Sequence, residues 1–296
     1  MTPEIVVPLI AYDSYAEVIA DNGYVIIAVN SIEYRQAQCC AYSIKSKMPT
    51  ASITLVVPDS DIVDEKFLTG FDAIVQLPFK QHTNRRQNDW QLYWCSPYTN
   101  TIALDCKTLV KDDQTTMWDY LIDHHSIAFP TSVNDIRQHK IKTKHQLHLE
   151  NEYDLEVVYS GMFFFKKNAE SLKHFKMADV YFQNWNQVYR EFLKAQHIPD
   201  FFEADVLHTL VANHIGVDVT THHNILSYID MRYSVTVGVL GKIKKWTDNL
   251  TVWSSDTGKI KIQNYAINGT IYYHENEFLT DEIFSEQESY YYNVTK

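Results

Sequence analysis

Short apolar runs alternate with helical segments in the first part of the chain, and this alternation restricts the fold more than any other feature. The helical segments are amphipathic or polar, and Ala37, Ala41 and Ile44 fall at helical spacing in the first of them. The apolar runs read as strands because they are short and continuous, as is typical of strands buried on both faces of a parallel sheet. The predicted strands cover residues 24–29, 53–57, 71–77 and 101–104, and the predicted helices cover residues 31–46, 61–69 and 85–96. Strands alternating with helices at this spacing predict an α/β fold with a doubly wound, mostly parallel sheet flanked by helices.

The second half of the chain differs from the first in composition and in the pattern of its predicted elements. Residues 133–152 are polar and rich in Lys and His, which favours a surface loop or hairpin, and a lid is one form it could take. Residues 157–165 predict an aromatic strand pair broken at Ser160 and Gly161, where a glycine lets a ligand or another strand approach closely. Helices are predicted at residues 170–175, 179–194 and 203–214, and the acidic tail from residue 281 is expected to be peripheral.

The length and composition favour one main domain with an appendage. A chain of 296 residues with 45% hydrophobic content can bury a sizeable core, and we find no internal repeat and no low-complexity linker. From residue 235, segments rich in Thr, Tyr and Ile alternate with turns such as Asn268-Gly269. We therefore predict a domain at residues 1–232 and a β-rich C-terminal appendage at residues 233–296 that packs on it.

The charge and the cysteines limit the partners and the compartment. The chain carries 26 basic and 37 acidic residues, so no overall positive field would draw it to nucleic acid or to an anionic membrane. No apolar run reaches the roughly 18 residues that span a bilayer, and the N-terminus lacks a signal-peptide pattern. The 4 cysteines have neither zinc-ligand spacing nor the density of a disulfide scaffold. We expect a soluble cytoplasmic protein with no membrane span, and a nucleic-acid partner is disfavoured.

Asp105 is the first candidate for a functional residue. Asp105 directly follows the predicted strand at residues 101–104, so it lies at the carboxyl end of the predicted sheet, where open α/β sheets bind their ligands. A carboxylate there, followed after one residue by another oxygen ligand, can hold a divalent metal against a diphosphate. In this chain the second position is Lys107.

Several segments taken together carry a family resemblance. They are Asn30 to Ala37, Ser43-Ile44, Trp90, Leu104 to Val110, Tyr159 to Phe163, and Asp205. In this order they resemble the glycogenin-like GT-A glycosyltransferases, which transfer a sugar from a nucleotide-diphosphate donor. The segments around Asp105 and Ser160-Gly161, and residues 227–232, also resemble glycosyltransferase-like proteins of tailed bacteriophages. The resemblance implies a GT-A fold, a retaining hexosyltransferase using a UDP-sugar and an unknown acceptor, and host cytoplasm if the protein is viral.

The resemblance also implies roles for individual residues. Asn30 would hydrogen-bond the base and Tyr34 would stack on it, although a half-buried helix residue is the alternative for Tyr34. Ser160 and Gly161 would face the sugar. Asp205 would lie near the anomeric carbon and the acceptor, with a helix N-cap as the alternative.

Lys107 occupies the second carboxylate position of the family's Asp-x-Asp pattern, and this changes the expected chemistry. Asp105 fits as a metal ligand, but an ammonium cannot ligate Mn or Mg. Lys107 could itself neutralise the diphosphate as a catalytic group, Asp112 or Asp113 could take over the ligation, or the activity could be lost. The last alternative describes a catalytically degenerate GT-A-like protein that binds or has a structural role.

The C-terminal part offers only weaker candidates. Asp230 and His274 could supply the remaining metal ligand of the family. The basic segment at residues 241–245 could meet phosphate charge. Adjacent histidines, at residues 124–125 and 222–223, point apart on helix and strand alike and are not ready chelates.

Overall fold

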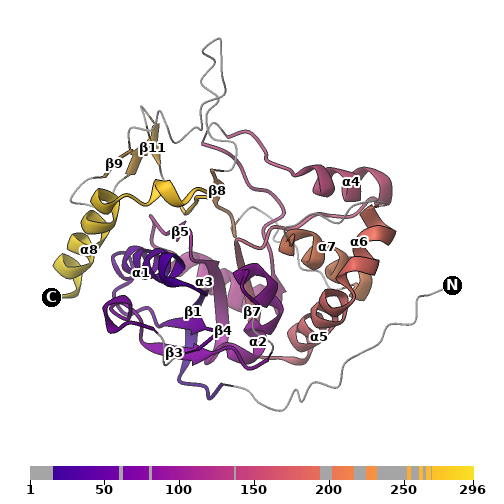
Figure 1. Cartoon of the computed structure of the whole chain (residues 1–296), viewed down its shortest axis with the longest axis horizontal. Helices are drawn as coiled ribbons and strands as arrows, with labels where there is room; N and C mark the ends of the chain where they lie inside the picture. The colour runs from indigo at the N-terminus through magenta and orange to yellow at the C-terminus, as the bar shows by residue number, and fades with distance from the viewer. Residues whose placement is uncertain are drawn as a thin grey trace, which may run out of the picture.

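A six-stranded sheet forms the centre of the molecule in the computed structural model (Figure 1). The structure describes residues 16–59, 63–79, 82–136, 138–193, 202–216, 225–231, 252–254, 260–262, 265–267 and 269–296. The strands lie in the order β3-β2-β1-β4-β7-β6, and their bounds are β1 Ala20–Ile27, β2 Ile53–Val57, β3 Ala73–Gln76, β4 Tyr98–Asp105, β6 Ile127–Ala128 and β7 Met162–Lys166. The first four are parallel, whereas β7 runs antiparallel to both β4 and β6. The predicted α/β class with a mostly parallel sheet is confirmed.

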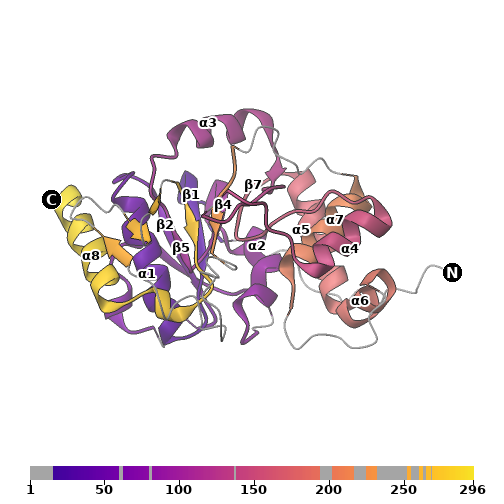
Figure 2. The same ribbon diagram turned by 90° about the horizontal axis from the view of Figure 1, so that it is seen from above.

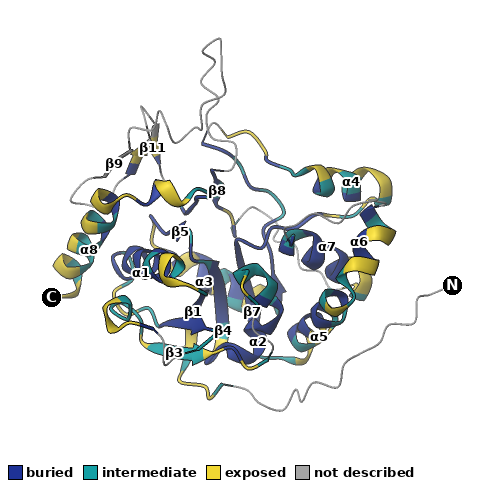
Figure 3. Cartoon of the chain, viewed as in Figure 1, coloured by how far each residue is buried: buried dark blue, intermediate teal, exposed yellow. Residues whose placement is uncertain are grey.

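Both faces of the sheet are covered, which explains why its strands read as continuous apolar runs. Val25 and Ile27 join one apolar cluster, and Tyr24 and Ile26 join another on the opposite face. Figure 2 shows α1 and α8 to one side of the sheet and α5, α6 and α7 to the other. Figure 3 shows the central strands as buried. The sheet therefore lies in a doubly wound layer, as the alternation predicted.

The first predicted helix matches the structure closely, whereas the helix at Thr115–His124 was not predicted. The α-helices are α1 Ser31–Lys45, α2 Leu92–Cys95, α3 Thr115–His124, α4 Lys144–Tyr153, α5 Ala169–Gln183, α6 Trp185–Leu193, α7 Ala204–Ile215 and α8 Asp281–Thr295. The short 3-10 helices are η2 Glu65–Phe67, η3 Arg85–Gln91 and η6 Asn276–Phe278. The predicted helix at residues 85–96 is thus a 3-10 helix that continues into α2. The predicted helix at residues 61–69 begins outside the described residues, and its described part holds η2.

Two predictions for the middle of the chain were wrong. Residues 133–152 are not wholly loop, because α4 begins at a reciprocal capping box between Thr143 and Gln146 and buries Leu149. The two predicted helices after residue 170 are instead one continuous helix, α5, followed by α6. The apolar spacing runs through the predicted break, and α5 ends only at its cap, Asn184.

The predicted strand pair at residues 157–165 is also only partly formed. Strand β7 begins at Met162, and residues 154–160 precede it without strand pairing. A Cβ at Gly161 would lie 2.7 Å from the Tyr228 hydroxyl, so the glycine permits this close approach. The Gly161 carbonyl accepts a hydrogen bond from the Asp105 N–H at 3.0 Å. This segment therefore connects the end of β4 with the C-terminal part of the chain.

Short strands are present in the C-terminal part, as predicted, and one of them pairs with a short strand that follows β4. Strands β9 Val252–Ser254, β10 Ile260–Ile262 and β11 Tyr265–Ile267 form an antiparallel sheet, and β5 Thr108–Leu109, β12 Ile271–Tyr272 and β8 Ile229–Asp230 form another. The acidic tail is not peripheral, because α8 lies along α1 with Tyr42 and Tyr291 stacked at 4.7 Å. The boundary between residues 232 and 233 stays a prediction. No helix in the described ranges is long and apolar enough to cross a membrane.

Candidate functional site

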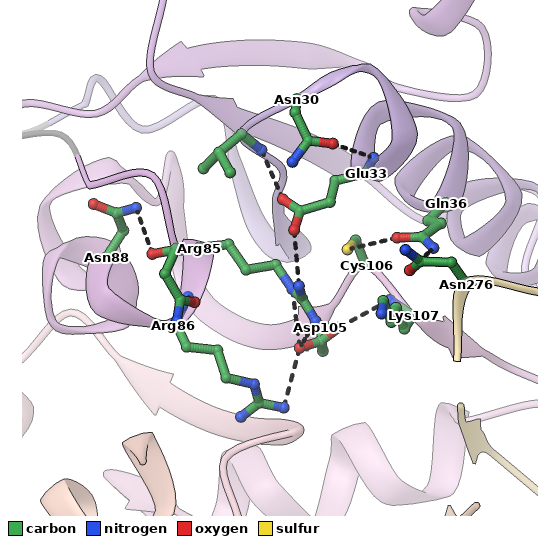
Figure 4. Close-up of polar contacts among 12 residues, drawn as sticks. Asn30, Glu33, Gln36, Arg85, Arg86, Asn88, Asp105, Cys106, Lys107 and Asn276 are labelled. Carbon is green, nitrogen blue, oxygen red and sulfur yellow. Dashed lines mark hydrogen bonds and ion pairs between the residues drawn. The ribbon is translucent and has the colours of Figure 1, made fainter. Parts of the chain in front are cut away.

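A network of charged side chains lies at the carboxyl end of the parallel strands (Figure 4). Asp105 is the last residue of β4, and η3 supplies Arg85 and Arg86. Arg85 donates through Nη2 to both carboxylate oxygens of Asp105 at 2.9 Å and through Nη1 to Glu33 at 2.8 Å. Arg86 Nη2 lies 3.1 Å from Asp105 Oδ2. We call Glu33, Arg85, Arg86 and Asp105 the charged network.

Arg86 also connects the charged network to Asp205. Its Nη1 donates to Ser160 Oγ at 3.0 Å, and its Nη2 donates to the Tyr272 hydroxyl at 2.7 Å. Ser160 in turn donates to Asp205 Oδ1 through both its N–H, at 2.7 Å, and its hydroxyl, at 2.8 Å. The two carboxylates predicted from the sequence are therefore brought together through Arg86 and Ser160.

Asp205 is not the N-cap of its helix. The cap position of α7 is Glu203, so Asp205 lies in the first helical turn. A carboxylate there is favoured by the helix dipole. Its Oδ1 accepts two hydrogen bonds from Ser160 rather than capping its own helix, and the predicted N-cap alternative for Asp205 was wrong.

Lys107 lies next to Asp230 and His274, the two C-terminal candidates for a metal ligand. Its backbone N–H donates to Asp105 Oδ1 at 2.9 Å, and its ammonium donates to the His274 carbonyl at 2.6 Å. His274 Nε2 lies 2.7 Å from Asp230 Oδ1, and the Asp230 side chain is fully buried. Asp230 and His274, which the sequence offered separately, thus contact each other beside Lys107.

A cavity of about 410 Å³ opens beside these residues. Part of its lining comes from residues of the site described above, and the rest comes from the beginning of α4 and from the segment around the beginning of α7. Its lining is Arg86, Thr143, Lys144, His145, Phe202, Glu203, Ala204, Asp205, Tyr272 and His274. A cavity of this size with convergent polar groups can hold a small polar ligand.

The pKa values of Asp105 and of the neighbouring Asp89 are shifted in opposite directions. Burial would raise the pKa of Asp105, but Arg85, Arg86 and the Lys107 N–H outweigh it and hold that pKa well below its ordinary value. Asp89 lies nearby, lining a cavity of about 10 Å³ with Arg85, Asp105 and Ser160. Burial raises the pKa of Asp89 to about 8. Asp105 is therefore ionised at neutral pH, whereas Asp89 is largely protonated.

The raised pKa of Asp89 predicts a loss of stability as pH increases. The folded chain holds this proton more tightly than the unfolded chain, so the stabilisation is complete below about pH 4 and is lost as pH rises through about 8. We expect the free energy of unfolding to fall by about 3–4 kcal/mol more in the wild type than in Asp89→Asn between pH 5 and pH 8. Urea unfolding at several pH values measures the difference, and parallel curves would contradict the assignment.

The predicted base-binding residues lie at the first turn of α1. Asn30 is the N-cap of this helix and accepts a hydrogen bond from the Glu33 N–H at 3.0 Å. Tyr34 is 4% exposed, so the half-buried alternative understates its burial, and its ring packs 6.0 Å from that of Phe67. The roles of Asn30 and Tyr34 toward a base stay predictions.

The donor set around Asp105 does not fit a divalent metal. Both Asp105 oxygens accept hydrogen bonds from guanidinium groups, and the second position of the pattern is an ammonium. Asp113 accepts hydrogen bonds from Thr115 at the start of α3. Within the described ranges, no three His, Cys, Asp or Glu side chains form a group that could hold a metal ion. A cation here would also lie beside Arg85 and Arg86, which repel it.

Sequence reasoning missed the arginines. The sequence pattern gives Arg85 no role beyond the first residue of a predicted helix, yet Arg85 and Arg86 organise the site. No sequence signal marks them, because their contacts with Asp105, Ser160 and Tyr272 form only in the folded chain. The basic segment at residues 241–245 and the histidine pair at residues 222–223 lie outside the described residues.

Comparison with known proteins supports the fold at low identity. No protein-family model matches the chain, and no curated protein matches it. An active-site mutant of LgtC has a TM-score of 0.52 and 14% identity, over 90% of this chain and 95% of LgtC. The galactosyltransferase LgtC in complex with donor and acceptor sugar analogs has a TM-score of 0.50 and 14% identity, over 90% of this chain and 94% of that one. The sheet order, the flanking helices and this likeness together show that the chain has the GT-A fold.

Proposed function

We propose that this protein is a glycosyltransferase that moves a hexose from a nucleotide-diphosphate donor, a UDP-sugar, to an acceptor hydroxyl with retention. One observation carries the proposal. Asp105 at the carboxyl end of β4 and Asp205 in the first turn of α7 are joined through Arg86 and Ser160, and Asp205 opens onto the cavity of about 410 Å³. The GT-A fold and a fold neighbour described with donor and acceptor sugar analogs support this choice of chemistry.

The reaction exchanges one bond at the anomeric carbon. The bond from this carbon to the diphosphate oxygen breaks, and its electron pair leaves with the nucleoside diphosphate. A new bond forms to the acceptor oxygen, whose proton is lost to the departing diphosphate or to solvent. The sugar passes through an oxocarbenium-like state, so fixed charges around the anomeric carbon and the diphosphate lower the barrier more than a strong base would.

The residues in and around the cavity would have different roles in this reaction. Asp205, held by Ser160, faces the cavity where the sugar would lie and stabilises positive charge at the anomeric carbon. Asp105 orients the guanidinium groups of Arg85 and Arg86, and the Arg86 group donates to Ser160 and Tyr272. Asn30 and Tyr34, at the start of α1, would hold the base.

A panel of nucleotide sugars tests the proposal. We would titrate UDP-glucose, UDP-galactose, UDP-N-acetylglucosamine and GDP-mannose into the folded chain by calorimetry, and then measure nucleoside diphosphate release without acceptor. We expect a UDP-sugar to bind and to be hydrolysed slowly, and proton NMR of the first-formed sugar to show the donor's anomeric configuration. Binding without any release would favour the degenerate alternative, and an absence of binding throughout would contradict the proposal.

A further inference from the structure

Lys107 occupies the second position of the Asp-x-Asp pattern that the family resemblance implies, and hydrogen bonds hold both its backbone and its side chain. Its N–H is bonded to Asp105 at 2.9 Å, and its carbonyl accepts from the Tyr273 N–H at 3.0 Å. The ammonium donates to the His274 carbonyl at 2.6 Å. The positive charge is therefore held between the end of β4 and the end of β12.

No carboxylate within the described ranges forms an ion pair with this ammonium. Asp105 is paired with Arg85 and Arg86 instead, and Asp230 contacts His274. Lys107 is neither fully buried nor exposed, and its ammonium has three N–H donors, of which the His274 carbonyl takes one. A partly buried cation that forms no ion pair with a described carboxylate favours an anionic ligand.

Among anions, the neighbouring groups favour a diphosphate. His274 and Arg86, which border Lys107 and Asp105, both line the cavity that Asp205 faces. A diphosphate next to Lys107 would leave its sugar on the Asp205 side of this cavity. A lysine ammonium is a compact charge suited to phosphate oxygens and can balance the charge of a departing diphosphate as a metal would.

We propose that Lys107 replaces the divalent metal in this protein and binds the donor diphosphate directly, so that nucleotide binding is metal-independent. This inference rests on the proposed glycosyltransferase function. Because the Asp105 oxygens are already occupied by guanidinium donors, addition of Mn would require the charged network to break.

The test compares uridine and UDP by calorimetry, each with EDTA and with Mn. We expect UDP to bind equally well in both conditions, Lys107→Met to weaken UDP binding by about 10- to 100-fold, and uridine binding to change little. Lys107→Arg keeps the positive charge and should stay within a few-fold of the wild type. Lys173→Met, an exposed change on α5 with the same loss of charge, should have no effect.

The outcomes separate this inference from the proposed function. UDP binding that requires Mn and is unchanged in Lys107→Met would overturn the role of Lys107 and leave the glycosyltransferase proposal standing. An absence of binding of UDP, GDP, CDP and ADP, with and without Mn, would overturn both. Thermal unfolding of each variant shows whether it is folded. If Lys107→Met is not folded, the comparison of EDTA with Mn on the wild type still decides, because UDP binding that requires Mn would overturn the inference.

Discussion

Replacement of Asp105 by asparagine should lower the free energy of unfolding by about 3–5 kcal/mol, because it leaves a buried pair of cations without their main counter-charge. The Asp105 side chain is 6% exposed, and the side chains of Arg85 and Arg86 are 13% and 18% exposed. Glu33 still pairs with Arg85 in the variant, but Arg86 loses its only carboxylate among the ion pairs of the described residues. Urea unfolding at neutral pH measures the loss.

A matched surface change provides the control. Asp281→Asn removes one partner of the ion pair with Arg35, but the Asp281 side chain is 94% exposed, so a cost of at most about 1 kcal/mol is expected. Because the folded-state pKa of Asp105 is depressed, its stabilisation is present at neutral pH and is lost as pH falls through the acid range. Equal losses in Asp105→Asn and Asp281→Asn would contradict the structural role given to the charged network.

Replacement of Asp205 by asparagine should act on turnover rather than on stability. The carboxamide oxygen can still accept from Ser160, so the fold keeps both hydrogen bonds. The negative charge facing the cavity is lost, and removal of one charge-stabilising group typically lowers kcat about 10²- to 10³-fold. Donor hydrolysis gives kcat, and calorimetry with the same UDP-sugar gives the dissociation constant, which should change only a few-fold.

The matched control for this prediction is Asp123→Asn, an exposed carboxylate on α3 outside the site. It should leave both quantities unchanged. If Asp205→Asn hydrolysed the donor within a few-fold of the wild-type rate, Asp205 would have no place near the reacting carbon. If it lost binding and turnover together, its role would be in holding the donor.

The strands of the sheet could be predicted because their residues are buried on both faces. Ile53–Val57 is a run of five buried residues, and its predicted bounds match β2. Segments whose structure depends on partners far along the chain were harder to predict from the sequence. Residues 157–161 have strand-like composition, but the Ser160 N–H donates to the Asp205 carboxylate and the Val158 N–H donates to the Thr209 hydroxyl instead of to a neighbouring strand.

A site residue could be predicted where its own position in the sequence, next to a recognisable strand, determines its location in the fold. Asp105 follows a buried strand, so its location at the end of β4 could be inferred directly. Arg86 could not be assigned a role from the sequence, because its importance arises from contacts with Asp105, Ser160 and Tyr272, which are distant along the chain. Helix α4 was missed because its capping box stabilises a helix in a polar segment with few apolar residues.

The central claim is that a nucleotide sugar binds with its diphosphate at Lys107 and its sugar on the Asp205 side of the cavity. A crystal structure with a non-hydrolysable UDP-sugar analogue, grown in EDTA, tests this most directly. The account predicts diphosphate oxygens within hydrogen-bonding distance of the Lys107 ammonium and the anomeric carbon on the side of Asp205 and the Arg86 guanidinium. A nucleotide bound elsewhere, or a diphosphate that lies away from Lys107 with the sugar outside the cavity, would contradict it.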